Sequence, residues 1–436
     1  MSQAVKVGAT SPMPWYNEIA PSCWRVLALA AAGWTFDIFD TFMLALTLPA
    51  LVGAFALSKA EAGAIGSLLA AGLVLGGIGF GWVADRIGRV RTLVMCVCLY
   101  SLFTGLTALA PGAAWVAGLR FAAGLGMGGT WTAGAALVAE TWGPRHRGKG
   151  GALMQMGLPI GSLLAIGAAA AVTSPMGGLA GNGWRMLYAL GALPALVVLA
   201  LARGTPESPL WQRRAEVREQ RHALAYEQRP AEARAQDDGF GGLIASGALG
   251  GVFVAFLFIF FCQYIYWGVF TWTPIFLITV KHFNFIHSLS FVLSQQLGSL
   301  LGFIVFAALI DRLGRRQTFF LYLFIGAVSV AIFVLANLAP VLYVAIFWTG
   351  FGITGLFAGM GPFTAELVPD TRTRGFGMGL AYNGGRLGGI LAPYLIGALA
   401  TSASGFQLGM STNIAAFAFA AMVIWTAPET RGAMLD

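Results

Sequence analysis

Long apolar stretches run through the whole sequence, and each is close to the length that a helix needs to cross a lipid bilayer. Hydrophobic residues make up 58% of the chain and charged residues only 10%. A typical soluble protein has about a quarter of its residues charged, so this composition indicates an all-α membrane protein. Because a crossing helix takes about 20 apolar residues, the sequence predicts twelve of them, at residues 26–52, 61–83, 92–110, 113–140, 149–173, 184–203, 246–278, 288–310, 317–337, 341–367, 376–400 and 410–427.

The loops between these stretches differ in their content of lysine and arginine. Twelve crossings put both termini on one side, which holds 21 of these residues, whereas the other side holds only Lys59, Arg185 and Lys281. Basic loops stay in the cytoplasm, so we expect a multi-pass protein of the bacterial inner membrane with both termini cytoplasmic. The long polar stretch at 204–245 is expected to form a cytoplasmic linker with a surface helix. It separates two domains, at residues 1–203 and 246–436.

The two halves of the sequence repeat one another in three places. The loop after the second predicted helix reads GWVADRIGRVR, and the loop after the eighth reads ALIDRLGRRQ. The fourth and tenth helices end on AETWGPRHRGKG and AELVPDTRTRGFG, and the sixth and twelfth are followed by TPESP and APETRG. Asp85 and Asp311 are 226 positions apart, as are Glu140 and Glu366. Matched motifs in one order and at one spacing indicate a duplicated unit.

These repeated loops resemble the signature loops of the major facilitator superfamily, over essentially the whole chain. The resemblance implies two pseudo-symmetric six-helix bundles that rock to expose a central cavity to each side of the membrane in turn. An aspartate at a helix end beside arginines can bond to the other bundle in one conformation only. Ten residues are therefore expected to gate this change, with a purely topological role as the alternative: Asp85, Arg86, Arg89, Glu140, Arg147, Asp311, Arg312, Arg315, Glu366 and Arg374.

Four ionisable residues lie inside the predicted helices: Asp37, Asp40, Arg120 and Arg386. A charge at the bilayer centre costs at least about 2.5–3.5 kcal/mol, so each is expected to face a partner or an aqueous cavity. Asp37 and Asp40 are three residues apart and share a helix face. Two acids so close do not both ionise easily, and we expect one of them to carry a proton. The alternative is a fixed ion pair between one acid and Arg120.

The two interior arginines are given different roles. Arg120 opens RFAAGLGMGGTW, which resembles the superfamily motif of an arginine followed by spaced glycines, and the resemblance implies a part in proton coupling. The alternative is a buried structural cation. Arg386 stands among glycines in YNGGRLGGILAP, and no acid in the interior of the second-half helices can neutralise it. A substrate carboxylate suits its planar guanidinium, with a purely structural contact as the alternative.

Polar and aromatic residues of the second half are candidates for the rest of the substrate site. The seventh helix contains FCQYIYWGVFTWTP, and aromatic rings with one hydrogen-bonding atom suit an amphipathic ligand. Helix packing is the alternative for each ring. The four histidines lie in loops and are expected to be solvated. The predicted substrate residues are Arg386, Gln263, Tyr264, Tyr266, Trp267, Trp272, Asn383, Gln295 and Gln296.

The stretches GWTFDIFD, GLGMGGTW, FTWTPIFL and PESP most resemble the organic acid–proton symporters, of the sialate/lactate and aromatic-acid branches. The resemblance implies uptake of a carboxylate with a proton and assigns Asp37 and Asp40 to proton coupling, although Thr130 stands where sialate/lactate-type members often have a glutamate. A proton-driven drug exporter and a sugar porter are the alternatives. The expected partners are a small organic anion, a proton and the lipid bilayer. We expect a monomer without nucleic acid, metal or cofactor, and find no catalytic set that would indicate an enzyme.

Overall fold

The computed structural model describes residues 15–57, 59–173, 179–225, 239–283, 285–400 and 402–432, and the regular structure of these residues is helical. The first half contains α1 (Pro21–Phe55), α2 (Lys59–Ile87), α3 (Arg89–Thr107), α4 (Ala113–Thr141), α5 (Arg147–Gln155), α6 (Gly157–Thr173), α7 (Trp184–Leu190) and α8 (Leu193–Ala202). The second half contains α12 (Leu249–Thr279), α13 (Phe285–Leu313), α14 (Arg315–Leu335), α15 (Ala339–Leu367), α16 (Arg374–Leu399) and α17 (Ala403–Thr426). Shorter elements are η1 (Trp15–Glu18), η2 (Leu179–Gly183), α9 (Pro209–Ala225) and α11 (Gly239–Ala245).

Two of the predicted crossings consist of two helices each. The fifth, predicted as one helix at 149–173, is α5 followed by α6, and the sixth, predicted at 184–203, is α7 followed by α8. Proline has no N–H to bond the carbonyl four residues earlier, and its ring clashes with that carbonyl. Pro159 therefore ends α5 at Gln155, and Pro194 ends α7 at Leu190. With these two breaks, the described residues contain all twelve predicted crossings.

Ten of the crossings are long and apolar enough, within the described residues, to span a membrane by composition alone. The other two are α4 and α16. Both are rich in glycine and each contains an interior arginine, Arg120 or Arg386, which lowers its hydropathy. Most of α4 from residue 123 to residue 140 is buried, and α16 packs against α2 and α12. Neighbouring helices therefore surround much of these two crossings.

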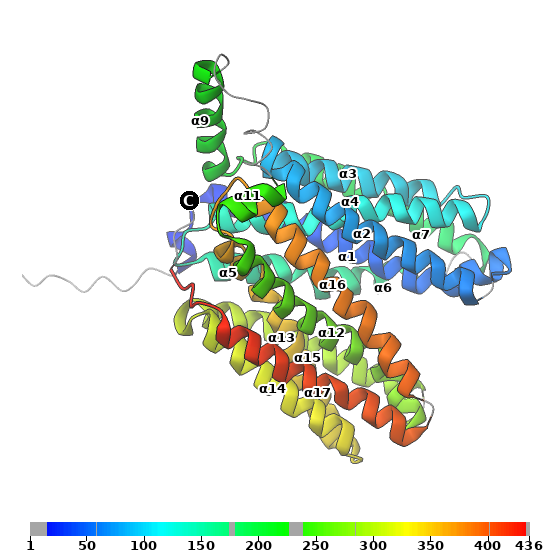
Figure 1. The fold of residues 1–436 in the computed structure, drawn as a ribbon. Coiled ribbons are helices and arrows are strands. Elements are labelled where there is room, and N and C mark those ends of the chain that lie inside the picture. The colour runs from blue at the N-terminus through cyan, green and yellow to red at the C-terminus, as the bar shows by residue number, and fades with distance from the viewer. Residues whose placement is uncertain are drawn as a thin grey trace, which may run out of the picture.

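The helices form two groups, α1–α8 and α12–α17, which approach each other at one end and diverge toward the other (Figure 1). Where they meet, α2 packs against α16, and α5 packs against α13 and α15. The meeting end carries η1, α9 and the loops at 142–146 and 368–373, and we call it the basic face because most arginines and lysines lie there. The predicted two-bundle architecture is confirmed, and α9 is the predicted surface helix. Residues 226–238 of the predicted linker lie outside the described residues.

Glycines allow α2 and α4 to cross in direct backbone contact. A β-carbon added to Gly76 would lie 1.9 Å from the carbonyl oxygen of Leu125, and one added to Gly128 would lie 2.1 Å from that of Leu73. Small residues give membrane helices close contact where lipid provides no hydrophobic drive for association. This crossing fixes α4, and with it the interior arginine of the first half, against α2.

Candidate functional site

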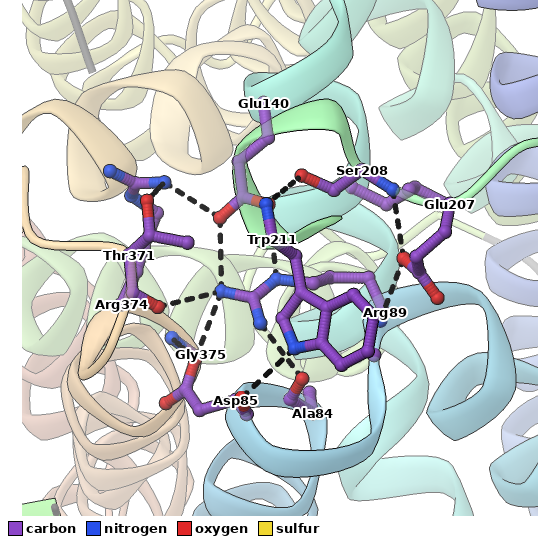
Figure 2. Close-up of polar contacts among 12 residues, drawn as sticks. Ala84, Asp85, Arg89, Glu140, Glu207, Ser208, Trp211, Thr371, Arg374 and Gly375 are labelled. Atoms are coloured by element: carbon purple, nitrogen blue, oxygen red, sulfur yellow. Dashed lines mark hydrogen bonds and ion pairs between the residues drawn. The ribbon is translucent and has the colours of Figure 1, made fainter. Parts of the chain in front are cut away.

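Arg89, at the start of α3, is the centre of a buried charge network at the basic face (Figure 2). Its guanidinium donates to the two carboxylate oxygens of Glu140 at 3.0 and 3.1 Å, and to Asp85 at 3.0 Å. It also donates to the backbone oxygen of Thr371, in the second half, at 2.9 Å. Arg374 of α16 donates to the same Glu140 carboxylate at 2.7 Å. This first network joins α2, α3 and α4 to the second half.

An equivalent network surrounds Arg315 at the start of α14. Arg315 donates to Glu366 at 2.7 and 3.0 Å and to Asp311 at 3.1 Å. Arg147, at the start of α5 in the first half, donates to Glu366 at 3.1 Å. Each half therefore supplies a glutamate, and the opposite half supplies an arginine from the first residue of α16 or α5. The repeat seen in the sequence has its counterpart in these two networks.

Asp85 and Asp311 each hold the first turn of a helix from the opposite half. Asp85 accepts hydrogen bonds from the backbone N–H groups of Gly375 and Phe376 in α16, both at 2.9 Å. Asp311 accepts from two N–H groups in the first turn of α5, at 3.2 and 3.1 Å. The first N–H groups of a helix have no partner within it and favour a negative charge. These bonds join the two halves at the basic face, and they break if the halves separate there.

Asp85→Asn is expected to loosen this closed face. The amide carries no charge and has one acceptor oxygen in place of two, so we expect the ratio of closed to open protein to fall about tenfold. Spin labels at Ile87 and Leu313, which are exposed near the basic ends of α2 and α13, report the distance between the halves. Glu216→Gln, at an exposed position of α9, is the control. If Asp85→Asn left the distance distribution unchanged, the bonds from Asp85 to α16 would not be what keeps the two halves together at the basic face.

The other two predicted gating residues, Arg86 and Arg312, have exposed side chains. Arg86 stacks on Trp82, with 3.7 Å between the guanidinium carbon and the ring centroid. Both arginines directly follow a network aspartate in the repeat. The duplication therefore preserves their charge at the surface of the basic face.

The motifs TPESP and APETRG supply a capping glutamate beside each network, which the predicted site residues did not include. Glu207 accepts from the first two backbone N–H groups of α3, at 2.9 and 3.0 Å. Glu429 accepts from the first two of α14, at 2.9 and 3.1 Å. Side-chain oxygens at a helix start satisfy N–H groups that the helix leaves unpaired. The third repeated motif therefore fixes the helices that carry Arg89 and Arg315.

Gly88→Ala is expected to destabilise the protein by about 1–3 kcal/mol. Gly88 precedes α3 with φ 108° and ψ 158°, a conformation almost restricted to glycine, and an added β-carbon would lie 2.4 Å from the Glu207 carboxylate. The thermal unfolding midpoint of the purified protein measures the loss. Gly79→Ala is the matched control, because nothing lies within 4 Å of its added carbon, and alanine favours a helix interior. Equal midpoints for the two variants would refute the capping geometry.

Helix α9 links the two halves at the basic face. The indole N–H of Trp211 donates to the backbone oxygen of Asp85 at 3.0 Å, as Figure 2 shows. Arg214, one turn later, forms an ion pair with Asp370 in the loop after α15, at 2.8 Å. Residues three apart lie on one face of a helix. The surface helix predicted from the linker therefore contacts both halves by the same face.

In the middle of the first half, Asp40 and Arg120 form a buried ion pair. One guanidinium nitrogen lies 3.1 and 3.0 Å from the two carboxylate oxygens. The second terminal nitrogen of the guanidinium, Nη2, donates to the hydroxyls of Thr104 and Thr107, at 2.8 and 3.2 Å. The ring of Tyr188 lies 4.9 Å from the guanidinium carbon. These partners belong to α1, α3 and α7, so the pair is enclosed by helices of one half.

Asp37, three residues before Asp40 on α1, is not a member of that ion pair. Its side chain is buried, and its Oδ2 atom has no hydrogen-bond partner among the described residues. The positive charge of Arg386, in α16, acts on the Asp37 carboxylate. Arg386 also lies beside Tyr382, with 5.5 Å from the guanidinium carbon to the ring centroid, and Gln263 of α12 lies within reach of the Tyr382 hydroxyl. An acid of the first half and an arginine of the second are thus within electrostatic range of each other.

An aromatic pair and an amide close the boundary between the halves next to these charges. Trp131 of α4 and Tyr382 of α16 stack with their ring centroids 3.5 Å apart and their planes at 12°. Trp131 donates to Gln155 at 3.1 Å, and Gln155 donates to the backbone oxygen of Phe357 in α15 at 2.8 Å. Tyr382 lies on α16 between the basic face and Arg386. These contacts join the two halves on the side of Arg386 that faces the basic face.

Residues 30–295 and 286–434 match the family model described as Major Facilitator Superfamily. The chain belongs to the major facilitator superfamily. This facilitator is therefore a multi-pass membrane protein and a secondary transporter, not an enzyme.

Relatives that match this facilitator over most of their length are transporters of small organic compounds. The "Probable 4-methylmuconolactone transporter" of Cupriavidus pinatubonensis is 32% identical, over 97% of this chain and 94% of that protein. The niacin transporter NiaP of Acinetobacter baylyi is 30% identical, over 95% of each chain. The gentisate transporter of Corynebacterium glutamicum is 30% identical, over 92% of this chain and 86% of that protein. The predicted resemblance to organic-acid transporters is confirmed.

A solved structure shows the same fold. The proton:xylose symporter XylE superposes on this facilitator with a TM-score of 0.76, covering 95% of this chain and 97% of the symporter. The sequences are 18% identical, so the likeness concerns the fold alone. It agrees with the two six-helix bundles described above.

Several predicted substrate residues of this facilitator make contacts within the second half. The Tyr264 hydroxyl lies 2.8 Å from a threonine hydroxyl of α17, and Trp272 donates to a backbone oxygen of α16 at 3.2 Å. Trp267 is 37% exposed and donates to Gln263 at 3.1 Å. Tyr266 stacks on Phe270 with the centroids 4.5 Å apart. Of the aromatic stretch in α12, Gln263 lies within reach of the Tyr382 hydroxyl, and Tyr266 is within electrostatic range of the same tyrosine.

The three other predicted amide residues, Asn383, Gln295 and Gln296, lie at helix contacts. Asn383 sits between α16, α2 and α4: its Nδ2 atom is 3.4 Å from the Thr132 hydroxyl, and a β-carbon on Gly77 would lie 1.8 Å from that nitrogen. Gln295 and Gln296 in α13 each have one buried amide atom without a hydrogen-bond partner in the described part of the chain. Asn383 therefore packs at the boundary between the halves.

Trp131, Gln155 and Tyr382 were not predicted as site residues, although the sequence carries signals for each. Tyr382 precedes Arg386 by four residues, one helical turn, so both lie on the same face of α16. Trp131 ends the glycine-rich stretch that Arg120 opens, and Gln155 is the one amide side chain in the predicted crossing at 149–173. What the sequence does not show is that these residues meet across the two halves.

Proposed function

We propose that this facilitator is a proton-coupled symporter that takes up a small organic carboxylate. The observation that carries the proposal is the buried Asp37 carboxylate of the first half, whose Oδ2 atom has no hydrogen-bond partner among the described residues and which lies within electrostatic range of Arg386 in the second half. A guanidinium binds a carboxylate through two parallel hydrogen bonds. Relatives named for transport of niacin, gentisate and cis,cis-muconate support an organic acid as the substrate.

In this mechanism, Asp37 and the substrate compete for one guanidinium. Without substrate, the Asp37 carboxylate is the counter-charge of Arg386. A bound carboxylate takes over that role, and Asp37 is left buried without a cation, so it binds a proton to avoid the cost of an unpaired buried charge. The site then holds one guanidinium, one substrate anion and one neutral acid. The anion and the proton are therefore carried together.

The Asp40–Arg120 pair has a supporting role in this proposal. It ties α1 to α3 and α4 within the first half through the bonds to Thr104 and Thr107. Asp37 lies one turn before Asp40 on α1, so the pair fixes the rotation of α1 that turns Asp37 toward α16. We assign proton binding to Asp37 and positioning to Asp40 and Arg120.

The basic face is cytoplasmic in this proposal, because lysine and arginine are retained on that side. With the basic face closed, the transport site receives its substrate from the opposite side of the membrane. Release into the cytoplasm requires the bonds from Asp85 and Asp311 to break and the Trp131–Tyr382 stack to part. Alternation between these states transports the substrate without opening both sides at once.

Uptake into sealed liposomes tests the proposal. Purified protein is reconstituted, and labelled niacin, gentisate or muconate is added outside under an inwardly directed proton gradient. Accumulation above the equilibrium level is expected, together with its loss when a protonophore collapses the gradient. A proton-driven exporter would instead accumulate a cationic or neutral compound against the opposite gradient, and a sugar porter would accumulate xylose. Failure to accumulate any acid would overturn the proposal.

A further inference from the structure

A cluster of charged side chains surrounds His146, outside the membrane-spanning segments. The sequence predicts a solvated histidine here, but the residue is 7% exposed because η1 folds over it, with the Trp15 ring centroid 6.1 Å away. The His146 Nε2 atom lies 2.9 Å from the carboxylate of Glu18 in η1. Its Nδ1 atom lies 3.0 Å from the ammonium nitrogen of Lys149 in α5. The imidazole therefore stands between an anion and a cation.

These contacts define the protonation state of His146. A lysine ammonium is a donor only, so the Nδ1 atom accepts and the imidazole is neutral, with its proton on Nε2 and donated to Glu18. Glu18 also accepts from Arg145 at 3.0 Å. The hydrogen bond from His146, followed by the charges of Arg145 and Lys149, holds the pKa of Glu18 below its usual value. Glu18 therefore stays ionised over the pH range in which a histidine titrates.

Lys149, the cation beside His146, also lies close to Asp311, the carboxylate that bonds the second half to α5. The ammonium nitrogen of Lys149 lies 3.7 Å from the Oδ2 atom of Asp311, in the second half. The backbone N–H of Lys149 already donates to that same oxygen at 3.1 Å. The Trp15 ring covers the ammonium at 5.4 Å. Lys149 is thus shared between an imidazole of the first half and a carboxylate of the second.

We propose that His146 is a second proton-binding site, separate from the transport site, and that its protonation holds the basic face closed. A proton on Nδ1 places a donor N–H and a positive charge 3.0 Å from the ammonium, so Lys149 leaves the imidazolium. The imidazolium keeps its bond to Glu18, which becomes charge-assisted. The released ammonium moves closer to Asp311 and strengthens the cross-half ion pair that the two already form at 3.7 Å, beside the bonds that Asp311 makes with α5.

This site makes the carrier sensitive to the product of its own activity. The inference rests on the cytoplasmic position of the basic face and on alternating access, as proposed above, and not on the identity of the substrate. Protons released with the substrate acidify the cytoplasmic surface, and acidification closes the exit. Uptake then slows as protons accumulate, before substrate is exhausted.

The pH dependence of the distance between labels at Ile87 and Leu313 tests this site, in full-length protein in lipid nanodiscs. All samples carry Asp37→Asn, which removes titration of the proposed transport site. Between about pH 8 and pH 5.5, the closed-to-open ratio is expected to rise roughly 3- to 5-fold, the effect of strengthening one partly exposed ion pair.

Two variants decide whether His146 is responsible. His146→Gln can still accept from Lys149 and donate to Glu18 but never becomes charged, and Lys149→Gln removes the cation that moves; both are expected to abolish the rise. The inference would be overturned if His146→Gln showed the same rise in the closed-to-open ratio. It would also be overturned if that ratio fell or did not change with pH in the Asp37→Asn parent. None of these outcomes bears on the coupling role of Asp37, which is tested by uptake in protein that retains it.

Discussion

Arg386→Gln is expected to weaken binding of the transported carboxylate about 10- to 100-fold, since a hydrogen bond to a charged group contributes about 1.5–3 kcal/mol. The amide keeps hydrogen-bonding atoms in place but removes the charge that the substrate and Asp37 share. Accumulation of the acid in liposomes should fall to the level of empty liposomes. Equilibrium binding of a labelled acid to purified protein measures the affinity directly.

Two further arginine variants make this prediction specific. Arg386→Lys keeps the charge without the planar fork and should give an intermediate loss. Arg185→Gln is the matched control, because Arg185 donates to the backbone oxygen of Ala108 at 2.7 Å and stacks on Trp184, far along the chain from the proposed site. If Arg386→Gln bound the acid as tightly as Arg185→Gln, the carboxylate assignment would be wrong.

Asp37→Asn is expected to separate substrate binding from proton coupling. The amide resembles the protonated acid, so Arg386 has no competing carboxylate and the anion should bind as well as or better than in the parent, with an affinity that no longer depends on pH. Exchange of labelled for unlabelled acid across the membrane should continue, whereas accumulation driven by a proton gradient should be lost. Normal gradient-driven accumulation in this variant would refute the role given to Asp37.

Asp40→Asn, three residues away, is expected to have a different effect. It leaves the Arg120 guanidinium buried without its counter-ion, and breaking one partner of a buried pair costs about 3–5 kcal/mol. The expected result is a lower unfolding midpoint and a lower yield of folded protein. Coupling in the molecules that do fold should persist. If Asp37→Asn and Asp40→Asn had the same unfolding midpoint and the same coupling, the separate roles proposed for the two acids would be wrong.

The repeat allowed much of the basic face to be predicted from the sequence. Asp85, Glu140 and their counterparts 226 positions later lie in motifs that recur in one order, so an equivalent role for both sets follows without coordinates. The partner of each charge does not follow. Glu140 and Glu366 each bind an arginine from the opposite half, and a sequence does not show which helix starts meet across two bundles.

For the four charged residues inside the helices, too, the sequence predicted the position but not the partner. Their depth in the membrane follows from helix rise and span boundaries, and all four could be placed near the middle of the bilayer. Their pairing depends on helix rotation. A three-residue step on α1 separates Asp40, which bonds Arg120, from Asp37, which lies within electrostatic range of Arg386. The burial of His146 was missed for a similar reason, because η1 covers it from a distant part of the chain.

The number of protons taken up when the anion binds tests the central claim most directly. Weakly buffered, purified protein is titrated with a labelled acid well above the pKa of that acid, and the pH change is recorded. Competition between Asp37 and the substrate for Arg386 predicts uptake of about one proton per bound anion in the parent and close to none in Asp37→Asn. Anion binding without proton uptake in the parent would contradict the account.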